Sequence, residues 1–188
     1  YTAFQYEGPA AIRYPRGPGP GAVIAQEMEL LEIGKAITVR EGTRVAILNF
    51  GTLLPAAAEA AEALDATLVN MRWVKPMDEA RVLELAESHE LLVTVEENAV
   101  AGGAGTGVGE LLSQAGISSP LMMLGIPNDF IEHGEHSAQL SALGLDASGI
   151  TASIMTRLEA TMSHPSSVEK DTPALATVIP AKAGIQSP

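Results

Sequence analysis

Two histidines in the C-terminal half of the chain, His133 and His136, form an H-x-x-H pair. Three carboxylates lie close to them in sequence: Asp129, Glu132 and Glu135. Imidazole and carboxylate groups at such spacing can bind a divalent metal ion. Gly134 separates the two histidines, however, and a flexible loop fixes the geometry of metal ligands poorly. The pattern therefore favours a solvated polar loop over a metal site.

Two adjacent carboxylates, Glu96 and Glu97, follow an apolar run at residues 91–95. That run predicts a buried central strand, and a strand end is a frequent place for a catalytic carboxylate. Adjacent strand residues point to opposite faces of a sheet, however, so these two side chains are poor partners for a single acid–base site. We expect one of them to face a packed helix or a partner subunit.

A glycine-rich turn at residues 102–107 comes next, and a helix is expected to start near Thr106. The glycines miss the spacing of a dinucleotide fingerprint, because Val108 or Glu110 stands where the third glycine would be. The turn also lacks the Gly-Lys-Ser/Thr of a P-loop, and the preceding carboxylates would repel a phosphate. A packing or interface turn is therefore favoured over an anion site.

Arg16 is the cation with the clearest potential for binding, since Pro15 before it and Gly17 after it would fix its direction. A guanidinium can hold a phosphate with two parallel hydrogen bonds. An arginine that bonds to carbonyl oxygens of a linker would show the same pattern. The residues alone leave both interpretations open.

The composition is that of a globular protein with an acidic surface. The chain has 188 residues, 46% of them hydrophobic, and a net charge of −12, which argues against nucleic acid or an anionic membrane as a partner. It contains no cysteine, so disulfides and thiolate chemistry are excluded. No signal pattern opens the chain, which fits a cytoplasmic protein. It begins at Tyr1 without a methionine, so we expect a piece of something longer.

The elements that must position these residues alternate between strands and helices. Residues 35–40 and 45–50 flank a turn and predict a hairpin whose first strand is an antiparallel edge. The remaining pattern predicts strands at 67–71, 91–95 and 121–124, and helices at 53–64 (capped by Thr52), 78–89 (from Asp78 to His89), 106–115, 136–143 and after Asp146. The expected fold is α/β, a three-layer α/β/α arrangement around a mostly parallel sheet.

Changes in composition divide the chain into segments. Residues 1–17 are too short to bury their own aromatics and resemble the trailing edge of a preceding domain. Residues 18–34 begin with alternating proline and glycine and predict a linker. The main domain is expected over residues 35–162. Residues 163–188 contain four prolines and no aromatic residue, which predicts a disordered tail.

Several long blocks of the sequence resemble one known family. They are GPAAIRYPRG at residues 8–17, VAILNFGTLLPAA from Val45, NMRWVKPMDE from Asn70, LVTVEENAVAGGAGTGV from Leu92 and LGIPNDFIEHG at residues 124–134. In the same order and at the same spacing, these blocks are similar to bacterial 1-deoxy-D-xylulose-5-phosphate synthases. The resemblance covers residues 1–160, and its fold would be that of a transketolase-type C-terminal domain.

The resemblance implies an activity for the whole protein. Such synthases depend on thiamine diphosphate and Mg²⁺, decarboxylate pyruvate and join the two-carbon fragment to glyceraldehyde 3-phosphate. Their product serves isoprenoid, thiamine and pyridoxal synthesis. They are homodimers with three α/β domains, so the expected partners of this chain are the rest of its own polypeptide, a second identical subunit and small-molecule substrates. Residues 1–17 would then be the end of the pyrimidine-binding domain.

At the level of single residues the resemblance transfers little. The second arginine of R-Y-P-R-G, here Arg16, would bind the phosphate of the substrate. No residue is assigned to catalysis, cofactor binding or metal binding, because the Gly-Asp-Gly motif of the family is absent from the sequence. The chain alone would be inactive and would contribute domain packing and dimer interface. The alternatives are a free-standing, non-catalytic α/β interaction module or the C-terminal domain of another transketolase-like enzyme.

Overall fold

The structure is a computed structural model that describes residues 1–14 and 26–163. Its described residues form a five-stranded sheet in the order β1-β3-β2-β4-β5, in which all neighbours are parallel except β1 and β3. The strands are β1 (Ile37–Arg40), β2 (Val45–Phe50), β3 (Thr67–Asn70), β4 (Leu91–Ala99) and β5 (Leu121–Ile126). The predicted α/β class and the mostly parallel sheet are confirmed.

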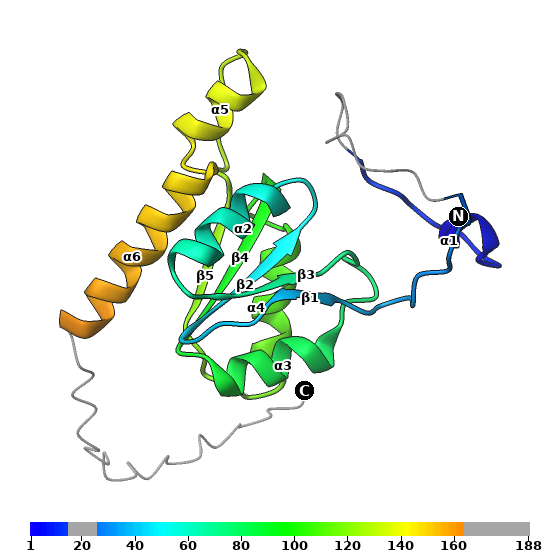
Figure 1. Ribbon diagram of the computed structural model, residues 1–188, viewed down its shortest axis with the longest axis horizontal. Coiled ribbons are helices and arrows are strands. Elements are labelled where there is room, and N and C mark those ends of the chain that lie inside the picture. The colour runs from blue at the N-terminus through cyan, green and yellow to red at the C-terminus, as the bar shows by residue number, and fades with distance from the viewer. Residues whose placement is uncertain (15–25, 164–188) are drawn as a thin grey trace, which may run out of the picture.

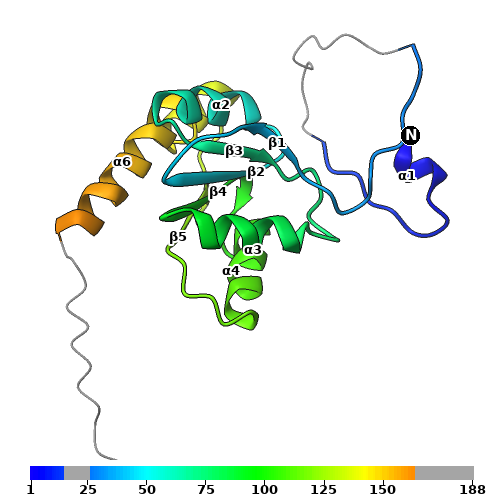
Figure 2. The ribbon, with the colours of Figure 1, turned by 60° about the horizontal axis from the view of Figure 1, so that its bottom comes forward.

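Helices cover both faces of this sheet, as Figure 2 shows. The helices are α1 (Thr2–Gln5), α2 (Leu54–Ala63), α3 (Glu79–Ser88), α4 (Ala104–Gln114), α5 (His136–Ala142) and α6 (Ala147–Ser163). α2 and α6 pack on one face of β2 and β4, around Ile47 and Val93. α3 and α4 pack on the opposite face, around Leu48 and Leu92. The predicted three layers follow from this alternation of apolar side chains.

The predicted hairpin between the first two strands is wrong. β1 pairs with β3, so that Ile37 lies opposite Asn70, and β2 lies between β3 and β4. The physical reason is burial: every residue of β2 is buried, which requires a central strand with neighbours on both sides. Arg40 fixes the edge position by donating to the Ala66 carbonyl at 2.8 Å. The prediction of an antiparallel edge strand is confirmed.

The helix ends agree with most of the predicted caps. Asp78 accepts the N–H of Arg81 at 3.3 Å, and Asp146 accepts the N–H of Gly149 at 2.8 Å. His89 is the C-cap of α3, as its position after the last turn predicted. Thr52 does not cap α2, whose N-cap is Leu53, because the Thr52 hydroxyl bonds elsewhere.

The chain before the sheet is exposed. Residues 1–14 carry large apolar side chains in water, including Phe4 at 85% and Tyr14 at 81% exposure, and Figure 1 shows this segment to one side of the sheet. The expectation that it cannot bury its own aromatics is confirmed. Residues 15–25 of the predicted linker and residues 164–188 of the predicted tail lie outside the described residues. No helix in the described ranges has the length and apolarity needed to cross a membrane.

Candidate functional site

The chain reverses its direction of winding at the carboxyl ends of β2 and β4. From β2 it crosses through α2 to β3 on one side, and from β4 it crosses through α4 to β5 on the other. β2 and β4 are adjacent parallel strands in the middle of the sheet, as Figure 1 shows. Ligands of open α/β sheets bind at such a reversal. Residues at or just after the carboxyl ends of these two strands are therefore the first candidates for function.

Glu96 faces the α3 and α4 layer and is 2% exposed. Its Oε2 accepts the N–H of Ala104 at 2.9 Å, and its Oε1 accepts the N–H of Gly105 at 2.8 Å. These are the first free N–H groups of α4, where the helix dipole also favours a negative charge. The helix N-terminus thus binds an anion that the protein supplies itself.

The glycine-rich turn makes this arrangement possible. A Cβ on Gly103 would lie 2.5 Å from the Glu96 Oε2, and a Cβ on Gly105 would collide with the buried Thr94 hydroxyl. Glycine is needed at both positions because the strand and the helix approach so closely. The predicted packing turn is confirmed, although β4 extends to Ala99 and α4 begins two residues before Thr106.

Glu97 points to the opposite face and joins three other segments. Its Oε2 accepts the Thr52 hydroxyl at 2.5 Å, and its Oε1 lies 2.7 Å from the Nε2 of His136. Its backbone carbonyl accepts the guanidinium of Arg13, also at 2.7 Å. We call Arg13, Thr52, Glu97 and His136 the Glu97 cluster. It brings together the N-terminal segment, the loop after β2, the end of β4 and the start of α5.

The electrostatics of the cluster keep Glu97 ionised. Partial burial raises the pKa of the Glu97 carboxyl, since the charged form loses water. Hydrogen bonds from Thr52 and His136, together with the positive charges of His136 and Arg13, act in the opposite direction and prevail, so the pKa lies below its ordinary value. At neutral pH the carboxylate is an acceptor and a negative anchor, and it has no proton to donate.

Of the other predicted site residues, the structure brings His136 to Glu97 but leaves His133 apart. Arg16 lies outside the described residues, so its binding role stays a prediction. His136 contacts Glu97, whereas His133 lies in the exposed loop before α5. Sequence reasoning missed the links from Glu97 to Arg13 and His136, which join residues 84 and 39 positions apart. The available signal was that polar residues lie close to the carboxyl ends of both strands, Thr52 just after β2 and Glu97 in the last part of β4.

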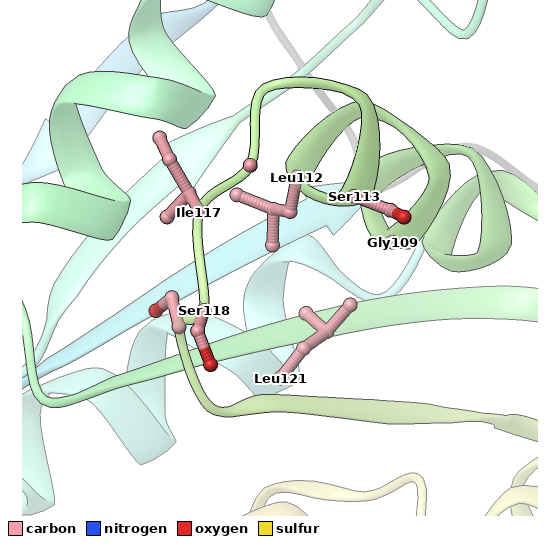
Figure 3. A pocket seen from close by; sticks show the side chains of 8 residues that line it. Gly109, Leu112, Ser113, Ile117, Ser118 and Leu121 are labelled. Carbon is pink, nitrogen blue, oxygen red and sulfur yellow. The ribbon is translucent and has the colours of Figure 1, made fainter. Parts of the chain in front are cut away.

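A hollow of about 390 Å³ lies at the opposite end of the sheet, between the end of α4 and the start of β5, as Figure 3 shows. Apolar side chains such as Leu112 and Leu121 and the hydroxyls of Ser113 and Ser118 line it. None of its lining residues titrates, so the hollow offers no acid, base or charged ligand. We assign it no chemistry.

The sequence profile described as "Transketolase, C-terminal domain" matches residues 34–150, more than half of the chain. The chain belongs to this family. Its residues before 34 include Arg13, so the Glu97 cluster joins the matched domain to a segment outside it.

The chain is similar to proteins that are much longer than it is. It is 55% identical over 84% of its length to 1-deoxy-D-xylulose-5-phosphate synthase of Chromobacterium violaceum, and 57% identical over 84% to that of Thioalkalivibrio sulfidiphilus. It spans 26% and 24% of these relatives, about a quarter of their length. Among solved structures it is similar to a "Split gene transketolase, inactive beta4 tetramer", with 32% identity, a TM-score of 0.64, and coverage of 70% of this chain and 44% of that one.

The described residues do not fit the cofactors of thiamine-diphosphate enzymes. No group of three or more histidine or acidic side chains in residues 1–14 and 26–163 could hold a metal ion. The glycine-rich turn cannot cradle a diphosphate, because the Glu96 carboxylate already occupies the N–H groups of α4. No catalytic step can be derived for the chain from such a cofactor.

Proposed function

We propose that this chain is the C-terminal part of a 1-deoxy-D-xylulose-5-phosphate synthase. The complete enzyme would bind thiamine diphosphate and Mg²⁺, condense pyruvate with glyceraldehyde 3-phosphate and release CO₂. The observation that carries this proposal is the 55% identity to the Chromobacterium violaceum synthase over 84% of the chain. The product would serve isoprenoid, thiamine and pyridoxal synthesis in the bacterial cytoplasm.

Within that enzyme the chain would have a supporting role. Its sheet and helices would pack against the preceding domain and contribute to the interface of a homodimer. The exposed aromatic residues of the N-terminal segment, among them Phe4 and Tyr14, are suited to be covered by such neighbours. Arg16 would bind the phosphate of the aldehyde substrate through two charge-assisted hydrogen bonds.

The isolated chain would be inactive; this is supported by the described residues, in which no group of three or more histidine or acidic side chains could hold the metal of the cofactor. The similar split-gene transketolase is described as an inactive tetramer, which supports this for a related chain. That relative also favours a second candidate, in which the chain is a separate subunit that becomes part of an enzyme only with another polypeptide. Activity that appears when this chain is mixed with a cofactor-binding subunit would distinguish the second candidate from the first.

The direct experiment is an assay of the full-length reading frame for pyruvate decarboxylation driven by glyceraldehyde 3-phosphate, with an Arg16→Ala variant alongside. Loss of a charge-assisted contact costs about 1.5–3 kcal/mol, so the KM for the aldehyde phosphate should rise by about 10- to 150-fold. The matched control is Arg157→Ala, an exposed arginine on α6, which should behave as wild type.

Three outcomes separate the parts of the proposal. An active wild type with an impaired Arg16→Ala variant supports both the synthase and the role of Arg16. An active wild type with an unchanged variant removes the role of Arg16 and keeps the enzyme. An intact, cofactor-loaded wild type without activity contradicts the proposed function.

A further inference from the structure

We propose that Glu97 is a positioning residue that fastens the segment before Arg16 to the carboxyl edge of the sheet. It does so through its backbone carbonyl, which binds Arg13, while its carboxylate is held by Thr52 and His136. The kinetic consequence for substrate binding rests on the proposed function, whereas the fastening itself does not.

The backbone of Glu97 is free to accept Arg13 because the sheet ends around it. β2 pairs with β4 only as far as Phe50, which lies opposite Glu96. On the other side, the register between β4 and β5 shifts between Val95 and Ala99. Glu97 therefore has no partner in either strand register, and its carbonyl can accept a side-chain donor instead of a ladder hydrogen bond.

The Glu97 side chain holds this carbonyl in place. Both carboxylate oxygens are bonded, one to the loop after β2 and one to α5, so the residue is restrained from two directions. The ionised carboxylate also attracts the guanidinium of Arg13. Charge-assisted hydrogen bonds of this kind are stronger than neutral ones. A change in the side chain should therefore loosen the contact that the main chain makes.

Fastening Arg13 restricts where Arg16 can be. Three residues of extended chain span at most about 11 Å, so the Cα of Arg16 cannot lie farther than that from the Cα of Arg13. Pro15 between them removes one backbone rotation. Covalent geometry alone would then keep Arg16, the predicted phosphate ligand, within this distance of the fastened Arg13. This is a positioning role, since Glu97 itself need not touch the substrate.

The test uses the cofactor-loaded full-length protein and two readouts. The first is the KM for glyceraldehyde 3-phosphate compared with the KM for pyruvate. The second is the rate of trypsin cleavage after Arg13, whose side chain must leave Glu97 before it can enter the protease. The variant is Glu97→Ala, and the control is Glu90→Gln, whose carboxylate pairs with Arg44 at the opposite edge of the sheet. Cleavage after Arg157 on α6 is the internal reference.

We expect Glu97→Ala to raise the KM for the aldehyde phosphate and the rate of cleavage after Arg13 by about fivefold each, because cleavage follows the population of the open form. The KM for pyruvate and cleavage after Arg157 should stay at their wild-type values. The Glu90→Gln control should be unchanged in all of these measurements. If Glu97→Ala fails to fold, Thr52→Val removes one restraint only and should give a smaller shift of both readouts in the same direction.

Three different results would each overturn a different part of the proposal. Cleavage after Arg13 at the wild-type rate in a folded Glu97→Ala variant overturns the fastening. Faster cleavage with an unchanged KM for the aldehyde phosphate overturns the effect on substrate binding. A wild type without synthase activity overturns the proposed function instead, and the cleavage rates still decide whether Glu97 fastens the segment.

Discussion

Two carboxylates that are neighbours in sequence lie in different environments. Glu96 is 2% exposed and binds two backbone N–H groups of α4, within the layer formed by α3 and α4. Glu97 faces the other layer and bonds to side chains from the loop after β2 and from α5. The period of two residues in a strand is enough to separate them. The Glu96 carboxylate therefore stabilises the fold, whereas Glu97 connects the fold to a segment outside the domain through its backbone carbonyl, which binds Arg13.

The largest effect expected from this comparison is on the buried carboxylate. Glu96→Ala would leave the N–H groups of Ala104 and Gly105 buried without an acceptor and remove the cap of α4. The free energy of unfolding should fall by about 2–4 kcal/mol, measured by urea unfolding of the chain. Glu110→Ala, an exposed position on the same helix, should leave stability unchanged. Equal effects of the two variants would contradict the role assigned to Glu96.

Two glycines of α4 test whether the close approach of β4 and α4 is what requires glycine. A Cβ on Gly105 would meet the buried Thr94 hydroxyl, so Gly105→Ala should destabilise the chain by about 1–3 kcal/mol. A Cβ on Gly107 would meet only the flexible end of Met77 at 3.4 Å. Gly107→Ala should instead stabilise the chain by about 0.5–1 kcal/mol, because alanine favours the helix. Thermal unfolding measures both shifts, and shifts of the same sign would show that close packing is not the reason for glycine here.

The half-buried carboxylate of Glu97 should have a small effect that depends on pH. The folded-state pKa of Glu97 lies below its ordinary value, so its interactions stabilise the fold above the pKa of the unfolded chain. That contribution is lost as the pH falls through the folded-state pKa. The difference in unfolding free energy between wild type and Glu97→Gln should be about 1 kcal/mol or less at neutral pH and should shrink below about pH 4.5. A difference that grows on acidification would contradict this assignment.

The amino-acid sequence predicted the layers of the fold and several local contacts correctly. The caps by Asp78 and Asp146 and the opposite orientations of Glu96 and Glu97 could be predicted, because they depend on neighbouring residues and on strand periodicity. The pairing of β1 with β3 could not, since the turn after β1 resembles a hairpin locally. In the structure all six residues of β2 are buried, and this burial requires neighbouring strands on both sides of β2, which a hairpin with β1 at the edge would not provide.

The candidate site was harder to predict than the fold. The contact between Arg13 and Glu97 spans 84 positions, and no local pattern encodes it. His136 was noticed for its spacing to His133, but its partner is a carboxylate 39 positions away. Both contacts depend on the order of the strands, which brings the ends of β2 and β4 together. Only the three-dimensional arrangement shows that one residue holds all of these segments.

The most direct test of the central claim is a double-mutant cycle between Arg13 and Glu97 in the full-length enzyme, with the KM for glyceraldehyde 3-phosphate as the readout. If Glu97 acts by fastening Arg13, the Arg13→Ala and Glu97→Ala variants remove the same restraint, and the double variant should be no worse than the more impaired single variant. Losses that multiply in the double variant would show that the two residues act independently and would contradict the account.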